Sequence, residues 1–191
     1  DELVRLLKDG GVIVWNTGDA TIDGGESASS FRQILYFLEK KMLLADTMIW
    51  EKTGSGALGS NRTYAQNFEY MFVISKDKHS TFNPIKDRRN VVTSGKASVN
   101  TSLKEGKGST RVIDRKEFGK RTNIWKIDPQ KNSKHPAPFP VSLAQDHIIS
   151  WSNPSDTILD PFAGSGTTAV AAERTGRKWI CIEKQPEYYY P

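Results

Sequence analysis

At 191 residues the chain is long enough for one domain with a hydrophobic core, and its 37% hydrophobic content is ordinary for a soluble protein. No stretch approaches the roughly 18 apolar residues of a membrane-spanning helix, and the acidic N-terminus is unlike a signal peptide. The single cysteine, Cys181, excludes a disulfide framework and a cysteine zinc cluster, so we expect a cytoplasmic protein without a metal site.

The first third of the chain predicts three strands and a helix. Apolar runs at 12–15, 47–50 and 70–75 read as strands, and the last run is continuous, as in a strand covered on both faces. Between the first two runs, an amphipathic helix follows Ser29 or Ser30 as N-cap. Its predicted core face is formed by Phe31, Ile34, Leu35, Leu38 and Met42.

Polar residues follow the first predicted strand and precede the third. Because ligands bind at the carboxyl ends of strands in open α/β sheets, Trp15, Asn16 and Asp19 are candidates for a binding pocket. A loop that only caps the sheet is the alternative. Further candidates before the third strand are Arg62, Asn67 and Glu69.

A strongly basic stretch follows, at residues 76–134. It holds 16 Lys and Arg against 6 Asp and Glu, a charge of +10, whereas the rest of the chain carries −5. The stretch is either a solvated, flexible surface segment or a phosphate-binding surface for nucleic acid. Residues 96–111 have few apolar side chains, so we expect them to order on a partner. The candidates for contact with phosphates or bases are Arg88, Arg89, Arg111, Arg115, Lys116, Lys120 and Arg121.

The last third predicts a helix at 141–151, a strand at 156–160, a helix that ends at Gly176, and a strand at 178–183. Alternation of strands and helices indicates an α/β sheet with helices on both faces.

A glycine-rich turn joins the last two strands through their helix. Gly164 and Gly166 let the backbone turn sharply and approach a ligand, and the helix start offers N–H groups to an anion. Acids end both strands, Asp160 and Glu183, so a nucleoside with an anionic group fits. A P-loop is excluded because Thr167 stands where its lysine must be.

Two cofactors remain. The turn matches the loose dinucleotide pattern, but such a fold normally continues into a second nucleotide half, and eight residues follow Glu183. The second cofactor is S-adenosylmethionine. Its ammonium would bind Asp160, its carboxylate would bind the start of the helix, and its ribose would bind Glu183.

The string "DPFAGSGTT…AAERTGRKWICIE" strongly resembles the cofactor motif of the DNA amino-methyltransferases, which methylate adenine N6 or cytosine N4. "HPAPFPVSLAQDHI" resembles the family motif that closes over the methionine end. In the permuted beta class the cofactor half follows the catalytic half. The resemblance thus implies a Rossmann-like α/β sheet, with the catalytic side at 1–75, a target-recognition insert at 76–134 and the cofactor half at 135–191.

The resemblance also implies site residues. The cofactor would be lined by Asp160, Phe162, Gly164, Ser165, Gly166, Thr167 and Glu183, with His135, Pro136 and Phe139 in the lid. The alternatives are core packing for the two phenylalanines, a turn cap for Asp160, a surface carboxylate for Glu183 and an exposed loop histidine for His135.

The family's catalytic motif, Asp, Asn or Ser followed by Pro-Pro and an aromatic residue, is absent from this sequence, and "NPSD" at 153–156 does not fit it. We therefore expect the catalytic residues upstream of Asp1, and a further edge strand beyond Pro191. Without the catalytic strand the sheet would be divided, with unpaired backbone groups along two edges.

The expected function is S-adenosylmethionine-dependent methylation of a flipped-out base in double-stranded DNA, with adenine N6 preferred to cytosine N4. Two rival functions are a non-catalytic DNA-binding protein of the same fold and a nicotinamide-dependent oxidoreductase. We also expect the protein to come from a prokaryote or a phage, to form a homodimer and to be paired with a restriction endonuclease.

Overall fold

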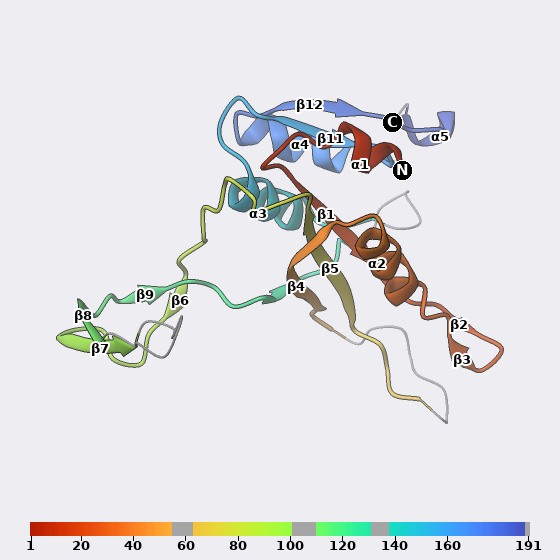
Figure 1. The fold of residues 1–191 in the computed structure, drawn as a ribbon. Helices are drawn as coiled ribbons and strands as arrows, with labels where there is room; N and C mark the ends of the chain where they lie inside the picture. Colours follow the sequence, from red (N-terminus) through yellow and green to blue (C-terminus); the bar gives the residue numbers. More distant parts are fainter. Residues whose placement is uncertain (55–62, 101–109, 131–137, 190–191) are drawn as a thin grey trace. The chain divides into compact units, whose positions relative to one another are not determined.

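The computed structural model describes residues 1–54, 63–100, 110–130 and 138–189. The chain forms two compact units (Figure 1). The first combines Asp1–Asn83 with Asn123–Pro191, and the second is Pro84–Thr122. The second unit spans fewer residues than the basic stretch at 76–134. One reason is that β10 (Ile124–Ile127) pairs with a strand of the first unit.

The first unit contains a four-stranded sheet in the order β1-β5-β4-β10. Its strands β1 (Val12–Thr17) and β4 (Leu43–Lys52) flank β5 (Phe68–Ser75) antiparallel, and β10 runs parallel to β4. The residues Met71–Ile74 of β5 are at most 4% exposed. The prediction of a strand covered on both faces is confirmed.

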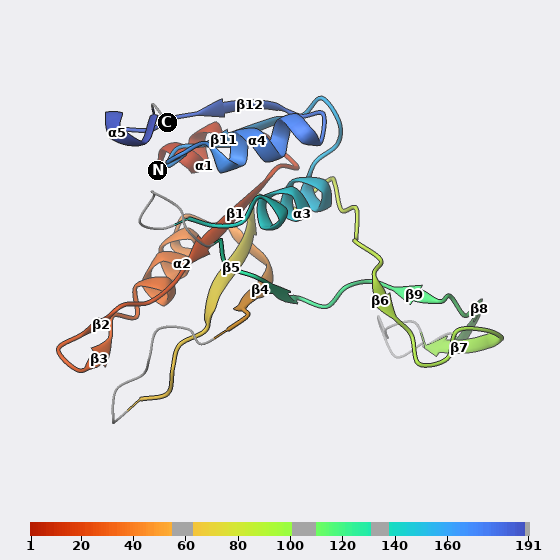
Figure 2. The same ribbon diagram turned by 180° about the vertical axis from the view of Figure 1, so that it is seen from behind.

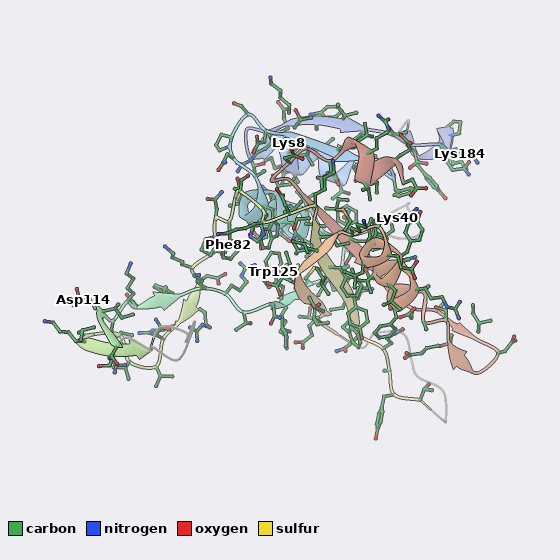
Figure 3. All side chains as sticks on the ribbon, viewed as in Figure 1. Lys8, Lys40, Phe82, Asp114, Trp125 and Lys184 are labelled. Atoms are coloured by element: carbon green, nitrogen blue, oxygen red, sulfur yellow. The ribbon has the colours of Figure 1, made fainter. Side chains whose placement is uncertain are left out.

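Helices cover opposite faces of this sheet (Figures 1 and 2). The helix α2 (Ser29–Glu39) packs Ile34 and Phe37 against Phe72 and Ile74, whose side chains share one face of β5. On the other face, α3 (Val141–Trp151) brings His147 to Met71 and to Trp125 of β10. Trp125 is labelled in Figure 3. The predicted bounds of α3 are confirmed.

The predicted core face of α2 is wrong in part. The helix buries Ser30, Ile34 and Phe37, whereas Phe31 is 47% and Leu35 56% exposed. Leu38 is exposed as well, and Met42 is buried but follows the end of the helix. Apolar residues occupy two adjacent stripes of α2, and contact with the sheet selects the stripe that contains the small Ser30.

A second, two-stranded sheet pairs β11 (Thr157–Asp160) with β12 (Lys178–Cys181) in parallel through α4 (Thr167–Arg174). The left-handed Gly176 ends α4 as predicted, and α4 packs on α3 through Ala144, Ile148, Ala171 and Ala172. Cys181, the last residue of β12, is half-buried.

Within the described residues, β11 pairs only with β12, and β1 only with β5. This division into two sheets agrees with the gap that the family resemblance implied.

The second unit consists of short antiparallel ladders. The strand β6 (Arg88–Arg89) pairs with β9 (Phe118–Gly119), and β7 (Lys96–Asn100) pairs with β8 (Thr110–Asp114). No described side chain of this unit is buried.

The remaining elements are α1 (Glu2–Leu6), the hairpin of β2 (Thr21–Ile22) and β3 (Gly25–Glu26), and α5 (Pro186–Tyr189). In the part of the chain that the structure describes, every helix is too short or too polar to cross a membrane.

Candidate cofactor site and nucleic-acid surface

The glycine turn lies against the chain that continues β12. The backbone N–H of Ile182 donates to the carbonyl of Asp160 over 2.9 Å, and that of Ala163 donates to the carbonyl of Ile182 over 3.0 Å. Gly166 has a φ of 84° and immediately precedes α4. A side chain is strained in that left-handed conformation, so the turn requires a glycine there.

Asp160 organises the turn through both carboxylate oxygens. Oδ1 accepts the backbone N–H of Phe162 over 2.9 Å, and Oδ2 accepts the hydroxyl of Thr168 over 2.5 Å. These bonds match the turn-cap alternative. They also leave acceptor capacity, because an ionised carboxylate has about four lone-pair sites.

Glu183 reaches back to the same turn. Its Oε2 accepts the N–H of Gly164 over 2.7 Å, and its Oε1 accepts the N–H of Gln185 over 2.8 Å. The structure thus brings Asp160, the last residue of β11, and Glu183, two residues after β12, to the same turn. Glu183 is half-buried and is not a free surface carboxylate.

Phe162 stands out of this turn and is 71% exposed, which core packing does not explain. Its ring meets the edge of Trp15, with ring centroids 6.3 Å apart and planes at 78°. Trp15 lies near the end of β1, so the carboxyl ends of β1 and β11 meet here.

Of the three residues predicted to form the lid, the structure describes one. Phe139 is half-buried and packs against the cluster between α3 and α4, as its core-packing alternative states. His135 and Pro136 lie outside the described residues.

Asp19, a pocket candidate, caps α2. Its Oδ1 accepts the hydroxyls of Ser27 and Ser29 over 3.0 and 2.9 Å and the N–H of Ser30 over 3.1 Å, and its Oδ2 accepts the Ser30 hydroxyl. Burial raises the pKa of Asp19, but these hydrogen bonds outweigh burial and hold the pKa far below its usual range. Because Ala28 is the N-cap, Ser29 and Ser30 are helical residues and not the cap itself.

A polar cluster extends across the sheet at the end of β1. The amide of Asn16 donates to Glu69 over 2.6 Å, and Glu69 also pairs with Lys52, whose ammonium lies 4.9 Å from the centre of the Trp50 ring. The other two early candidates are Asn67 and Arg62. Asn67 accepts the N–H of Lys52 through its backbone, and Arg62 lies outside the described residues.

The basic candidates of the second unit fall into two groups. Some are held within the unit: Arg121 forms an ion pair with Asp87 at 2.5 Å, Arg88 donates to the carbonyl of Lys120, and Arg115 donates to the carbonyl of Lys96. The hydrogen bond from Arg121 lowers the pKa of Asp87.

The other described candidates, like Arg88 and Arg115 of the first group, lie at the surface. Lys116 and Lys120 are exposed, and Arg89 is 3.9 Å from Glu117 with both side chains largely solvated. The side chain of Arg111 is outside the described part.

Among the described residues, no group of three or more His, Cys, Asp or Glu side chains is arranged to hold a metal ion. His147 is instead a core residue. Its Nε2 lies 3.0 Å from the sulfur of Met71, and its ring lies 4.5 Å from that of Trp125. Burial lowers the pKa of His147 to about 3, so the ring is neutral at physiological pH.

Comparison with known proteins places this geometry in a family. The model of the N6/N4 DNA methylase family matches residues 1–190. The chain belongs to this DNA methylase family. It is 46% identical over 199 residues to the orphan methyltransferase M.BamHII of Bacillus amyloliquefaciens, and the match covers 98% of this chain and 75% of that relative. It is 28% identical to the type II methyltransferase M1.MboII of Moraxella bovis, over 97% of this chain and 72% of that protein.

Solved structures agree on the fold of this DNA methylase. The PvuII DNA methyltransferase, described as cytosine-N4-specific, superposes with a TM-score of 0.69 at 24% identity, over 95% of this chain and 62% of its own. A complex of M1.HpyAVI with S-adenosylmethionine gives a TM-score of 0.64 at 25% identity, over 96% and 72%. The chain thus spans only part of the length of these relatives.

Sequence reasoning missed two residues of the methylase that shape the site, Thr168, which binds Asp160, and Lys52, which pairs with Glu69. It named Trp15 and Phe162 but did not predict the contact between their rings. The Thr-Thr pair at the start of α4 was a usable signal for Thr168, because hydroxyls are common near helix starts. The other two contacts join residues far apart in the sequence, and no local pattern announces them.

Proposed function

We propose that this chain carries the cofactor-binding and target-recognition parts of an S-adenosylmethionine-dependent DNA methyltransferase that acts on an exocyclic amine. One observation carries the proposal. Asp160 ends β11, Glu183 follows the adjacent parallel strand β12 by two residues, and both are hydrogen-bonded to the glycine turn that precedes α4. This is the arrangement that a nucleoside with an anionic group requires.

The residues of the turn fit S-adenosylmethionine part by part. Asp160 holds the ammonium, and the start of α4, with Ser165, Gly166 and Thr167, receives the carboxylate. A Cβ placed on Gly166 would meet no atom within 4 Å, so the approach to the helix start is open. Glu183 takes the ribose hydroxyls.

Phe162 offers an exposed aromatic surface next to the turn. A positively charged sulfonium or ammonium is attracted to such a ring face. His135, Pro136 and Phe139 belong to the lid of this proposed site.

When bound, the cofactor supplies an electrophilic methyl group. The chain's own contribution is positioning, which converts a reaction between separate molecules into one within a complex. Trp15 and Asn16 at the end of β1 border the target base, next to the Phe162 ring. The proposed catalytic motif, an acceptor side chain followed by Pro-Pro and an aromatic residue, lies upstream of Asp1.

The second unit is the proposed DNA surface. It carries 11 Lys and Arg against 4 Asp and Glu, and none of its described side chains is buried. Neutralisation of phosphates by such a surface releases counterions and makes binding salt-dependent.

The expected target is adenine N6, because the family modifies it often, and cytosine N4 presents the same exocyclic amine. We place the enzyme in a prokaryotic cytoplasm or a phage-infected cell, as a homodimer with a paired restriction endonuclease.

Incubation of the full-length protein with methyl-labelled S-adenosylmethionine and DNA, followed by mass spectrometry of the nucleosides, tests the proposal. We expect the label in N6-methyladenine. Label in N4-methylcytosine would instead show that the target is cytosine N4. Binding of cofactor and DNA without transfer would favour the non-catalytic DNA-binding protein. Binding of a nicotinamide cofactor in place of S-adenosylmethionine would contradict the methyltransferase.

A further inference from the structure

The polar cluster formed by Asn16, Glu69 and Lys52 lies at the edge of the sheet where β1 ends. Asn16 is opposite Met71 in the register of β1 and β5, and Glu69 stands two residues before Met71. Both side chains therefore share the face of the sheet on which His147 of α3 contacts Met71. The cluster joins three strands on one face of the sheet.

Glu69 is held in place from two sides. Its Oε1 pairs with the ammonium of Lys52, which lies 4.9 Å from the centre of the buried Trp50 ring. A Cβ on Gly18 would lie 3.3 Å from Cγ of Glu69, so the chain that leaves β1 passes close to this side chain. The side chains of Glu69 and Lys52 are only 22% and 30% exposed. These contacts restrict where the carboxylate of Glu69 can lie.

This carboxylate determines the orientation of the Asn16 amide. The Nδ2 of Asn16 donates to Oε2 of Glu69 over 2.6 Å. A carboxylate accepts hydrogen bonds and donates none, whereas an amide has one accepting oxygen and one donating nitrogen. The reverse orientation would place two oxygens against each other, so Oδ1 of Asn16 is turned away from Glu69. Asn16 is exposed, and among the residues that the structure describes this oxygen has no hydrogen-bond partner.

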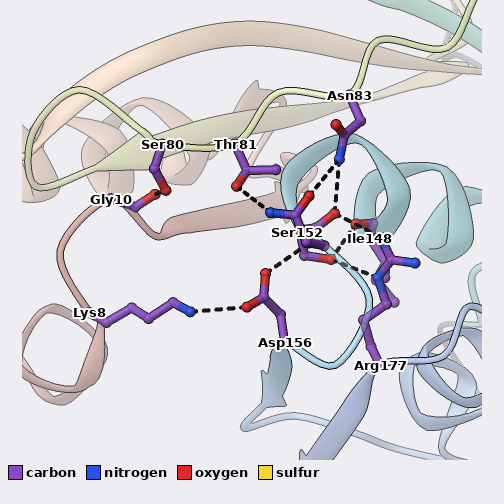
Figure 4. Close-up of polar contacts among 10 residues, drawn as sticks. Lys8, Gly10, Ser80, Thr81, Asn83, Ile148, Ser152, Asp156 and Arg177 are labelled. Carbon is purple, nitrogen blue, oxygen red and sulfur yellow. Dashed lines mark hydrogen bonds and ion pairs between the residues drawn. The ribbon is translucent and has the colours of Figure 1, made fainter.

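Another polar network of the first unit, at the C-terminal end of α3, has a structural explanation (Figure 4). The amide of Asn83 donates to the carbonyls of Ile149 and Ser152 over 3.2 and 3.1 Å. Arg177 donates to the carbonyl of Ser152 over 2.7 Å. The last carbonyls of a helix have no donor within the helix, so both side chains cap α3. The polar cluster at the end of β1 bonds to no helix end in the described part of the chain, and capping does not explain it.

The Asn16 oxygen lies where a ligand of this fold is expected. Asn16 follows Trp15, whose ring contacts that of Phe162 in the cofactor turn, and ligands bind at the carboxyl ends of such strands. Enzymes that flip a base out of the duplex read its edge through hydrogen bonds. An acceptor suits the exocyclic amine of adenine or cytosine and repels the carbonyl that guanine and thymine carry instead.

We propose that Asn16 binds the exocyclic amine of the target base through Oδ1, and that Glu69, paired with Lys52, is a positioning residue that keeps this oxygen turned towards the base. This inference rests on the proposed function and deepens it, since it names a contact that separates amine-bearing bases from the others. An exocyclic amine has two N–H bonds, so an acceptor in the proposed upstream motif can bind the second.

Glu69→Gln tests the orientation with almost no change of shape. The oxygen of the new amide can still accept from Lys52, which leaves its nitrogen to donate to Asn16. The Asn16 amide must then turn round and present its own nitrogen to the base, so that two donors oppose each other. In the full-length protein we expect kcat/KM for DNA methylation to fall about tenfold, with the Kd for S-adenosylmethionine changed less than about twofold.

The matched control is Glu51→Gln on the same strand. Glu51 forms an ion pair with Lys126 at 3.2 Å and projects from the face of β4 opposite to that of Lys52. The control therefore loses an ion pair of the same kind without a contact to Asn16. It should change kcat/KM less than about twofold.

A double substitution tests the polarity of the contact. Asn16→Asp alone sets two carboxylates against each other and should lower kcat/KM about tenfold or more. Combined with Glu69→Gln, the aspartate again has a donor as neighbour and an oxygen free for the base. The double variant should recover kcat/KM to within about threefold of the unaltered protein. No recovery, or rates that merely follow Tm in all the variants, would overturn the inference.

A second readout needs no activity. The side-chain amide protons of Asn16, assigned by their loss in Asn16→Asp, report the bond to the carboxylate in nitrogen-15-resolved NMR spectra. Glu69→Gln should shift the bonded proton upfield, and Glu51→Gln should not. An unchanged resonance in Glu69→Gln also overturns the inference. If the unaltered full-length protein transfers no methyl group, the proposed function fails, and the NMR shift then still decides the orientation of the amide.

Discussion

The glycine turn and the second unit are organised in opposite ways. The turn is held by its own backbone bonds to Asp160 and Glu183 and lies beside a packed interface between α3 and α4. The second unit has strand ladders and ion pairs such as Arg121 with Asp87, but no buried side chain among its described residues. A site for a small cofactor needs atoms held in place before the cofactor binds, whereas the proposed role of the second unit, contact with the large charged surface of DNA, is compatible with a unit that orders on its partner.

The largest expected effect concerns the turn. Asp160→Ala removes the acceptor of two hydrogen bonds and the proposed partner of the ammonium. We expect the Kd for S-adenosylmethionine to rise about 100-fold, because charged hydrogen bonds each contribute roughly 1.5–3 kcal/mol. Calorimetric titration measures this. Asp9→Asn, an exposed carboxylate, is the control, and equal affinity in both variants would refute the role of Asp160.

A second substitution tests whether helix capping, in addition to core packing, stabilises the first unit. Asp19→Ala should lower the free energy of unfolding by about 2 kcal/mol, because Asp19 accepts bonds from three serines at the start of α2. Urea denaturation gives the value, with the exposed Glu26→Ala as control. A loss no greater than that of the control would show that α2 is held by packing alone.

The third change separates the two groups of basic residues in the second unit. The double variant Arg89→Gln, Lys116→Gln alters surface charges and should weaken DNA binding about tenfold and reduce the slope of log K against log salt by about 2. Arg121→Gln breaks the ion pair with Asp87 and should affect the unit's stability more than the slope. Fluorescence anisotropy across a salt series measures both. If the unaltered protein, the double variant and Arg121→Gln all gave the same slope of log K against log salt, this surface would be excluded as the phosphate contact.

The smallest expected effect, counted per pH unit, is a pH dependence of the free energy of unfolding that comes from a residue of the first unit. The folded pKa of His147 is about 3, below its ordinary 6.5, so between these values the unfolded chain binds more protons than the folded one. Stability therefore falls as pH drops through this window, by about 1 kcal/mol per pH unit from this group. His147→Leu should remove this part of the slope. Ser150→Ala, on the same helix but without a titrating group, should keep it, and an unchanged slope in His147→Leu would contradict the burial argument.

Local patterns were sufficient for several elements of the first unit. The bounds of α3, the covered strand β5 and the end of α4 at Gly176 all followed from apolar periodicity and from glycine positions. Such features depend on neighbours within a few residues, which the sequence displays directly. The buried face of α2 did not follow, because two apolar stripes were present and only contact with the sheet chose between them.

By itself the sequence determined the family, the glycine turn with its two acids, and the concentration of positive charge, because each is written in adjacent residues. Only the tertiary structure decided which charges are paired, that Phe162 stands exposed beside Trp15, and that Asn83 caps a helix about 70 residues further on. Those facts arise from hydrogen bonds and ring contacts between segments that are distant in sequence, whose partners are selected when the backbone folds.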